Sequence, residues 1–285
     1  MEESQHNPID ASQLRRWLAE DMPEGDITTE ATVGPEQQAR GELVAKAEMI
    51  LAGCDVFAAV FRLLDPEVKV ESAAGDGEPV HAGQIPLRVR GRTRALLGGE
   101  RTALNLLQRM SGIATVTRRY VKAVEGTGAS ILDTRKTMPG LRALDKYAVA
   151  VGGGKNHRRD LSHAVLIKEN HIRMAGGVEA ALAAAAAMRG RAAWIEIEVT
   201  SQEELRAAIA GGPDVILLDN MTPEETAACV QLVRDAGQKI LTEASGGITL
   251  ANVRRYAEAG VDWISVGALT HSAPAMDLSF EIEPE

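Results

Sequence analysis

The chain has 285 residues, of which 45% are hydrophobic and 25% are charged, and its formal net charge is −9 at pH 7. This length and composition exclude a largely disordered chain and suffice for one large domain or two smaller ones, each with its own core. A sequence pI near 5.3 argues against nucleic acid as the main partner, because proteins that bind a phosphate backbone usually carry a basic domain.

The cysteines and the apolar runs indicate the cellular location of the protein. Cys54 and Cys229 lie far apart without companion Cys or His residues at ligand spacing, so the sequence indicates neither a disulfide framework nor a zinc site. The first ten residues lack the pattern of a signal peptide, and no apolar run approaches the roughly 18 residues of a membrane span. We expect a cytosolic protein that binds no membrane.

The first part of the chain predicts a small α+β unit. Residues 12–21 have apolar side chains at helical spacing, and Pro23 then ends the helix. Between residues 39 and 97, short runs alternate apolar and polar residues between glycine-rich turns, which is typical of antiparallel strands with one exposed face.

A long helical pattern follows. Apolar residues recur every three or four positions from Leu104 to Val124, which predicts one long helix or two helices broken at Ser111 and Gly112. On this pattern we interpret Arg109 as an ordinary solvent-exposed arginine.

Beyond Gly126, runs of Val, Ile and Leu alternate with amphipathic helical patterns. Strands that are apolar throughout are buried on both faces, so this half predicts a parallel sheet with helices outside it. The six runs are ASILDT, HAVLIKEN, WIEIEVT, DVILLDN, KILTEASGG and DWISVGALT. Six units are too few for a complete eight-unit barrel. We therefore predict an α/β protein with an α+β domain at 1–115 and an incomplete α/β (TIM-like) barrel at 116–270, with the tail at 271–285 as a candidate to pack on the first domain.

The stretch from Asp133 to Arg173 is cationic, with nine Lys and Arg residues against four acids. Such a segment in an acidic protein attracts anions locally, because charges farther than about 8 Å away are largely screened at physiological salt. Arg135, Lys136 and Lys168 each lie where an apolar run ends, and catalytic groups of β/α folds lie at strand ends. We interpret the stretch as an anion site.

Two carboxylates end consecutive predicted strands, Glu198 and Asp219. A pair of hard oxygen ligands suits Mg²⁺. The alternative is a pair of structural acids that bridge to neighbouring Lys or Arg side chains. Glu196 lies on the same strand face as Glu198, so the sequence does not separate the two, and we favour Glu198 because it is closer to the strand end.

Glycines mark a third kind of site. The segment SGGI at 245–248 precedes a helix predicted to begin near Thr249, and Gly267 follows the next strand. Free N–H groups at a helix start bind phosphate, and in barrels such a site often follows the last two strands. The sequence thus predicts a phosphate site beside the carboxylates.

Motifs over nearly the whole chain resemble the quinolinate phosphoribosyltransferase family, also called carboxylating nicotinate-nucleotide pyrophosphorylases. They are EDMPEGDITTE, GERTALNLLQRMSGIAT, DTRKTMPGLRALDKYAVAVGGGKNHR, LIKENH, IEIEV, LLDN, EASGGI and VGALTH. The resemblance implies that quinolinate and phosphoribosyl pyrophosphate form nicotinate mononucleotide, pyrophosphate and CO₂ in de novo NAD biosynthesis, with Mg²⁺ and without an organic cofactor. It also implies that the N-terminal domain is an open sandwich and that a homodimer, whose further assembly the sequence leaves open, completes its sites across subunits.

The resemblance also assigns roles to residues. It implies that Lys136, Lys168, Glu198 and Asp219 are catalytic. It implies quinolinate contacts from Arg135, His157, Arg158 and Lys168, with Arg101 supplied by the partner subunit. It implies that Lys136, Glu198 and Asp219 act on phosphoribosyl pyrophosphate and its Mg²⁺, with Glu198 and Asp219 as metal ligands, and that Ser245, Gly246 and Gly267 contact its phosphates.

Three alternatives stay open at this point. A ModD-like paralogue would use the same scaffold with a different acceptor, although such proteins tend to lose the Gly-Gly-Lys-Asn-His-Arg segment that this chain retains. A class I aldolase would use Lys168 as a Schiff-base nucleophile. A non-catalytic anion-binding protein would bind ligand without turnover.

Overall fold

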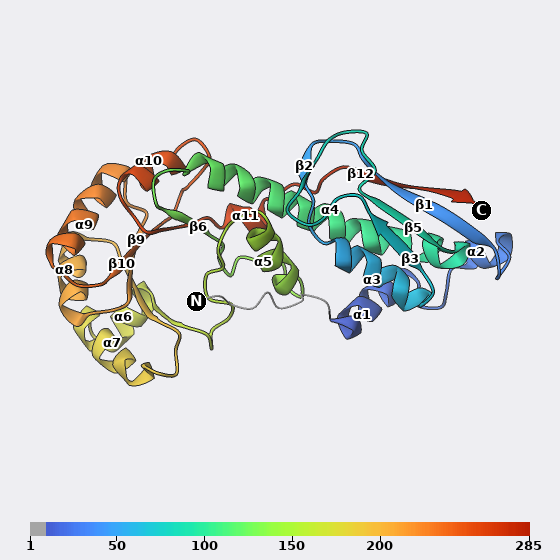
Figure 1. Cartoon of the computed structure of the whole chain (residues 1–285). Coiled ribbons are helices and arrows are strands. Elements are labelled where there is room, and N and C mark those ends of the chain that lie inside the picture. The colour runs from blue at the N-terminus through green and yellow to red at the C-terminus, as the bar shows by residue number, and fades with distance from the viewer. Residues whose placement is uncertain (1–9) are drawn as a thin grey trace. The chain divides into compact units, whose positions relative to one another are not determined.

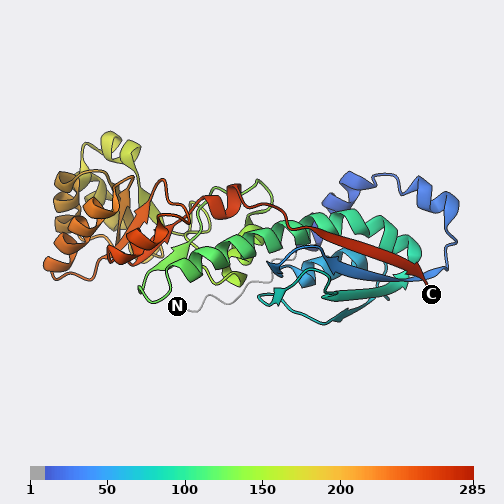
Figure 2. The same cartoon turned by 90° about the horizontal axis from the view of Figure 1, so that it is seen from above.

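The computed structural model describes residues 10–285, which form two compact units (Figures 1 and 2). The N-terminal unit contains the described residues up to Arg118 together with Met138–Gly153 and Ser272–Glu285. The barrel unit contains Arg119–Thr137 and Gly154–His271. The segment 138–153, expected within the barrel region, therefore groups with the N-terminal unit.

An antiparallel sheet organises the N-terminal unit, with strand order β12-β1-β5-β3 (Figure 1). Along β1 every second residue is buried, as the alternating sequence predicts. The tail strand β12 pairs with β1 from Leu278 to Pro284. The bounds of the strands are β1 Gln38–Ala45, β3 Lys69–Ser72, β5 Leu87–Arg92 and β12 Leu278–Pro284, with a separate pair of β2 Met49–Ile50 and β4 Pro79–Val80.

The helices of this unit are α1 Ala11–Asp21, α2 Ile27–Thr32, α3 Cys54–Leu64 and α5 Arg142–Val151, together with α4 Thr93–Ala123 as far as Arg118. The alternating pattern gave no sign of α3, which lies between strands. Its Phe57 and Phe61 are fully buried and pack edge-on, with ring centroids 5.1 Å apart. Phe280 of β12 packs edge-on against Phe57 at 5.7 Å, so the tail contributes to the core of this unit.

Helix α4 runs unbroken through Ser111 and Gly112. Ser111 accepts a hydrogen bond from the backbone N–H of Ala52 at 3.1 Å. A Cβ at position 112 would lie 2.0 Å from the carbonyl oxygen of Pro274. These two residues therefore let neighbouring backbone approach the helix, and the alternative of two helices is wrong.

Arg109 is not the exposed arginine that the sequence suggested. Its Nε and Nη2 atoms each lie 2.8 Å from an oxygen of Asp145, whose side chain is fully buried. Asp145 belongs to α5, a helix that the polar composition of the stretch 133–173 concealed. Because a bidentate pair with a buried carboxylate is strong, this contact anchors α5 in the N-terminal unit.

Six parallel strands form the sheet of the barrel unit, in the order β6-β11-β10-β9-β8-β7. Their bounds are β6 Ser130–Leu132, β7 Val165–Ile167, β8 Ile195–Val199, β9 Val215–Asp219, β10 Leu241–Ser245 and β11 Trp263–Ser265. Each lies in one of the six predicted runs, and the strands curve into an arc with helices outside (Figure 1). Strands β6 and β7 are the two edge strands of this sheet, so the six strands do not form a closed ring. The prediction of an α/β fold with an incomplete barrel is confirmed.

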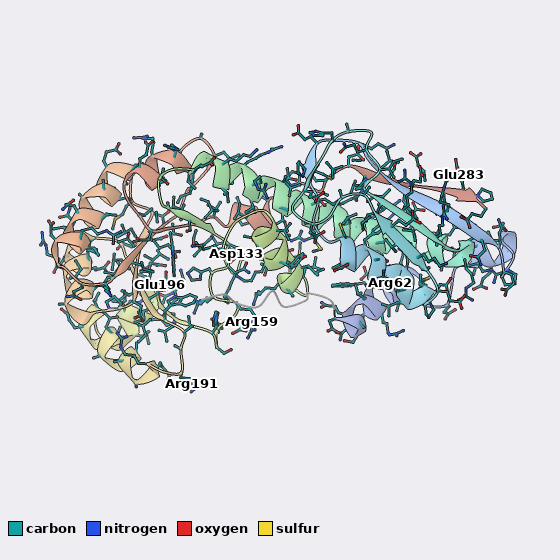
Figure 3. The ribbon with its side chains drawn as sticks, viewed as in Figure 1. Arg62, Asp133, Arg159, Arg191, Glu196 and Glu283 are labelled. Atoms are coloured by element: carbon teal, nitrogen blue, oxygen red, sulfur yellow. The ribbon has the colours of Figure 1, made fainter. Side chains whose placement is uncertain are left out.

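The helices from α6 to α10 connect successive strands as crossovers, and α11 follows the last strand: α6 Glu169–Ala175, α7 Val178–Ala185, α8 Gln202–Gly211, α9 Pro223–Asp235, α10 Val253–Glu258 and α11 Ala268–His271, with a 3₁₀ turn at Ala186–Met188. Glu196 and Asp133 lie in the interior of the unit, whereas Arg191 lies at its surface (Figure 3). Within residues 10–285, no helix combines the length and apolar character that a membrane crossing needs.

Candidate active site

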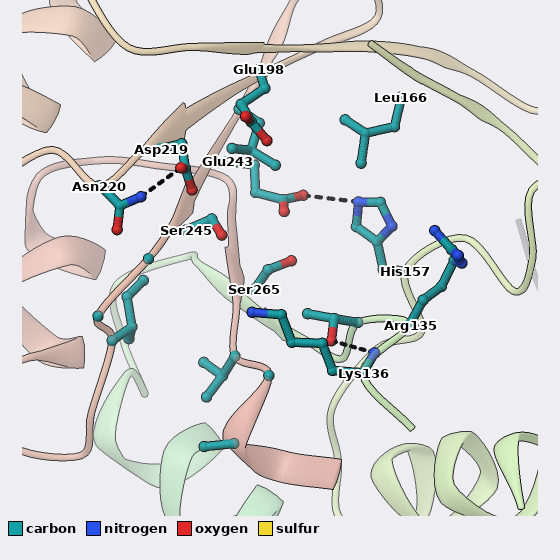
Figure 4. A pocket seen from close by; sticks show the side chains of 18 of the residues that line it. Arg135, Lys136, His157, Leu166, Glu198, Asp219, Asn220, Glu243, Ser245 and Ser265 are labelled. Atoms are coloured by element: carbon teal, nitrogen blue, oxygen red, sulfur yellow. Dashed lines mark hydrogen bonds and ion pairs between the residues drawn. The ribbon is translucent and has the colours of Figure 1, made fainter. Parts of the chain in front are cut away.

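A pocket of about 740 Å³ opens among the segments that follow the strands of the barrel unit (Figure 4). This volume suits a small organic ligand. Ten of the predicted site residues line it: Arg135, Lys136, His157, Arg158, Lys168, Glu198, Asp219, Ser245, Gly246 and Gly267. Parallel strands bring their carboxyl ends to one edge, and this explains why residues up to 132 positions apart in the chain meet here.

The cationic part of the pocket contains Arg135 and Arg158. The Arg158 guanidinium is buried and donates to the carbonyl of Ala164 at 3.1 Å. Burial and the nearby charge of Arg135 lower the pKa of Arg158, while Glu196 opposes this change. The Nε atom of Arg135 is buried and makes no hydrogen bond within residues 10–285. Two neighbouring guanidiniums, one with an unused buried donor, form a site that an anion would stabilise.

The carboxylates lie in the same pocket, beside Lys168. The Nζ atom of Lys168 is 2.6 Å from Oε2 of Glu198. Burial and the charge of Glu198 raise the pKa of Asp219, while Lys168 and the amide of Asn220 lower it. The two carboxylates therefore repel each other and are only partly neutralised. This pair of hard oxygen donors fits a divalent cation such as Mg²⁺.

The structure separates Glu196 from Glu198. Both side chains point from β8 to the same side, but Glu198 lines the pocket while Glu196 is fully buried. Oε2 of Glu196 accepts a hydrogen bond from the indole N–H of Trp194 at 3.0 Å. Glu198 is therefore the residue of the two that can meet a ligand.

His157 lies at the floor of the pocket and is buried. Its Nε2 atom is 3.0 Å from Glu196 and 3.4 Å from Glu243. Burial lowers the pKa of His157, but the two carboxylates outweigh burial and raise it. Burial and the charge of Glu196 also raise the pKa of Glu243, to about 7. The raised pKa values mean that His157 and Glu243 each hold a proton more tightly than an isolated histidine or glutamate would.

The loop after β10 approaches the loop after β9 closely. Gly246 has φ 92°, and a Cβ there would lie 2.1 Å from Oδ1 and 2.9 Å from the backbone nitrogen of Asn220. Asn220 itself has φ 54°, and its side chain donates to Asp219 at 2.6 Å. The helix predicted to begin near Thr249 begins at Val253, because Asn252 accepts the N–H of Thr249 and holds residues 249–252 as a turn.

We expect Gly246→Ala to lower the free energy of unfolding by on the order of 1–3 kcal/mol and to weaken phosphate binding, because the added methyl displaces Asn220. Gly176→Ala is the matched control, since Gly176 has φ 91° but no atom within 4 Å of an added Cβ. Thermal unfolding and the KM for a phosphorylated substrate measure the two effects. Equal losses of unfolding free energy in the two variants would mean that only the positive φ of the glycine, and not the contact with Asn220, causes the destabilisation.

Sequence reasoning missed other residues that line the pocket, among them Thr134, Leu166, Asn220 and Ser265. Asn220 follows Asp219 directly, so its place after a strand end was the available signal. Arg101 is not among the lining residues; it is exposed on α4 in the N-terminal unit, 3.9 Å from Glu100. Its expected role comes only from the family resemblance.

An incomplete α/β barrel whose pocket combines guanidiniums, paired carboxylates and glycine loops defines an enzyme class that handles organic anions and phosphates. Residues 26–111 match the N-terminal domain and residues 113–281 the C-terminal domain of quinolinate phosphoribosyl transferase. The chain belongs to the quinolinate phosphoribosyltransferase family.

Individual relatives agree over most of their length. The chain is 43% identical to a probable nicotinate-nucleotide pyrophosphorylase [carboxylating] of Bacillus subtilis, covering 94% of this chain and 92% of the relative. It is 45% identical to the nicotinate-nucleotide pyrophosphorylase [carboxylating] of Mycobacterium leprae, covering 94% and 95%. The solved nicotinate-nucleotide pyrophosphorylase of Francisella tularensis superposes with a TM-score of 0.91 at 38% identity, covering 99% of this chain and 100% of that one.

Proposed function

We propose that this chain transfers the phosphoribosyl group of phosphoribosyl pyrophosphate to quinolinate and releases CO₂, forming nicotinate mononucleotide and pyrophosphate in de novo NAD biosynthesis. The observation that carries the proposal is one pocket that joins Arg135 and Arg158 to Glu198 and Asp219. The names and the coverage of the relatives support the same reaction. The family match and the retained Gly-Gly-Lys-Asn-His-Arg segment do not favour a ModD-like acceptor or a binding-only protein.

Quinolinate carries two carboxylates on a pyridine ring. Planar guanidinium groups bind carboxylates through two parallel hydrogen bonds, so Arg135 and Arg158 are suited to them. The unused, buried Nε of Arg135 would gain an acceptor when quinolinate binds. Apolar side chains of the pocket, Leu166 and Leu217, offer contacts for the ring.

The other substrate carries phosphates. Glu198 and Asp219 would hold Mg²⁺, which would neutralise negative charge on the departing pyrophosphate. Lys136 and Lys168 add positive charge to the same pocket, and the loops at Gly246 and Gly267 offer backbone N–H groups to the phosphates. Together they would favour loss of pyrophosphate as the ribose develops positive charge.

Decarboxylation follows from the first step. Once the pyridine nitrogen bears the ribose, its positive charge stabilises the electron pair left at C2 when CO₂ departs. C2 then takes up a proton. No organic cofactor is needed for this chemistry.

The direct test mixes the protein with quinolinate, phosphoribosyl pyrophosphate and Mg²⁺. We expect equal amounts of nicotinate mononucleotide and CO₂. Mass spectrometry measures the nucleotide, and quinolinate with labelled carbon in its C2 carboxyl group reports the CO₂ released. Binding of both substrates without product would support the binding-only alternative. Borohydride trapping of a carbonyl substrate on Lys168 would support the aldolase.

We also propose a homodimer in which Arg101 of each chain completes the quinolinate site of the other. The support is indirect: Arg101 is exposed and does not line the pocket of its own chain. A cytoplasmic location and any assembly beyond the dimer stay predictions.

We expect Arg135→Lys to raise the KM for quinolinate roughly ten- to hundredfold, because lysine keeps the charge but cannot form two parallel hydrogen bonds. Arg158→Lys should act similarly. Arg159→Lys is the control, since Arg159 is exposed and pairs with neighbouring Asp160. If both Arg135→Lys and Arg158→Lys keep the wild-type KM for quinolinate, these arginines do not contact the substrate.

A further inference from the structure

Two ionisable side chains that line the pocket, His157 and Glu243, lie close together (Figure 4), and a third, Glu196, lies next to His157 outside the pocket lining. Nε2 of His157 is 3.0 Å from Glu196 on β8 and 3.4 Å from Glu243 on β10. Both glutamates are fully buried. Two buried carboxylates that share one imidazole form an uncommon arrangement, because each buried charge is costly unless paired.

The other side of the imidazole is held as well. Nδ1 of His157 accepts the backbone N–H of Arg158 at 2.8 Å, and the backbone N–H of His157 donates to Asp133 at 2.9 Å. A proton on Nδ1 would face the N–H of Arg158. The geometry therefore places a ring proton at Nε2, on the side of the two carboxylates.

Glu196 is itself oriented by its neighbours. The indole N–H of Trp194 donates to Oε2 of Glu196 at 3.0 Å, and the Trp194 ring packs edge-on to His157 with centroids 5.7 Å apart. The charge of Glu196 also favours the charged form of Arg158, against burial and Arg135. Both carboxylates therefore act on His157, and Glu196 also acts on Arg158.

We propose that Glu196 and Glu243 are positioning residues of the quinolinate site, which hold the imidazole of His157 in one orientation with its proton at Nε2. This inference rests on the proposed function. Glu196 does not line the pocket, and Glu243 lines it with a fully buried side chain; both act through His157, and Glu196 also acts through Arg158. A consequence is that His157 shapes the pocket with its ring, while the guanidiniums of Arg135 and Arg158 supply the hydrogen bonds to quinolinate.

The kinetic test uses Glu196→Gln and Glu243→Gln, which keep the side-chain shape and remove the charge. We expect the KM for quinolinate to rise roughly tenfold or more in each, with the KM for phosphoribosyl pyrophosphate changed less than about twofold. Asp65→Asn is the matched control, because Asp65 is also a buried carboxylate, paired with Arg92 in the N-terminal unit. It should lower Tm without changing either KM. A glutamine variant that loses stability with both KM values unchanged overturns the proposal.

A second readout does not need turnover. Long-range ¹H–¹⁵N spectra of the full chain report which nitrogen of each of its six histidines carries the proton, and the signals absent from His157→Asn identify His157. We expect a single form protonated at Nε2 in the wild type and a mixture of forms in the glutamine variants. A wild-type His157 that carries its proton at Nδ1 and none at Nε2 overturns the proposal. If the wild type makes no product while its spectra show the single Nε2 form and the glutamine variants lose it, the proposed function fails and the positioning of His157 stands.

Should the glutamine variants not fold, Trp194→Phe carries the test, because it removes the N–H donated to Glu196 and keeps a smaller aromatic ring at this position. We expect a rise of roughly fivefold in the KM for quinolinate. An unchanged quinolinate KM in folded Trp194→Phe overturns the proposal.

Discussion

Asp219→Ala is expected to lower kcat/KM for phosphoribosyl pyrophosphate by on the order of 100-fold and to raise the Mg²⁺ concentration needed for half-maximal rate. The reason is local. Asp219 ends β9 beside Glu198, and burial together with the charge of Glu198 raises the pKa of Asp219, so a cation close by would stabilise its charged form. Removing one leaves a single hard ligand. Glu198→Ala should act in the same direction and also release Lys168 from its ion pair.

Asp262→Ala is the matched control for this prediction. Asp262 also lies in the barrel unit, but before β11, where it pairs with Arg234 and accepts hydrogen bonds from Thr242. Its loss should lower Tm and leave the Mg²⁺ dependence unchanged. Should Asp219→Ala or Glu198→Ala keep the Mg²⁺ dependence of the wild type while losing stability, that carboxylate is a structural acid.

The second large effect is expected from mixing two inactive variants. Arg101→Ala and Lys168→Ala dimers should each be nearly inactive if every site takes Arg101 from one chain and Lys168 from the other. After joint unfolding and refolding, a heterodimer carries both lesions in one site and none in the other. Random pairing puts about half of the chains in heterodimers, so roughly a quarter of the wild-type activity should return.

A second pair of variants supplies the control. Lys168 and Glu198 lie 2.6 Å apart within one chain, so a mixture of Lys168→Ala and Glu198→Ala chains leaves no intact site in any dimer. It should recover no activity. If heterodimers of Arg101→Ala and Lys168→Ala are confirmed by mass and the mixture stays as inactive as this control, Arg101 serves its own chain or does not act in the reaction.

Much of the barrel unit could be predicted from sequence, because its strands are continuous runs of Val, Ile and Leu and their spacing is that of β/α units. The polar residue after each run then marks a pocket at one edge of the sheet, and Lys168, Glu198 and Asp219 were found in this way. Helices α3 and α5 escaped prediction. The first is short and apolar among alternating strands, and the second lies in a polar stretch whose Asp145 is buried by Arg109.

What the sequence by itself determined is the order of the strands of the barrel unit and the chemical types at the strand ends, since both follow from local periodicity and from runs of buried residues. Only the tertiary structure decided that Glu198 and not Glu196 faces the pocket, because strand alternation places both on one side and depth alone separates them. It also decided the partners of His157, which come from β8 and β10, 39 and 86 residues farther along the chain. Contacts between such distant segments depend on how parallel strands stack side by side, and no local pattern records them.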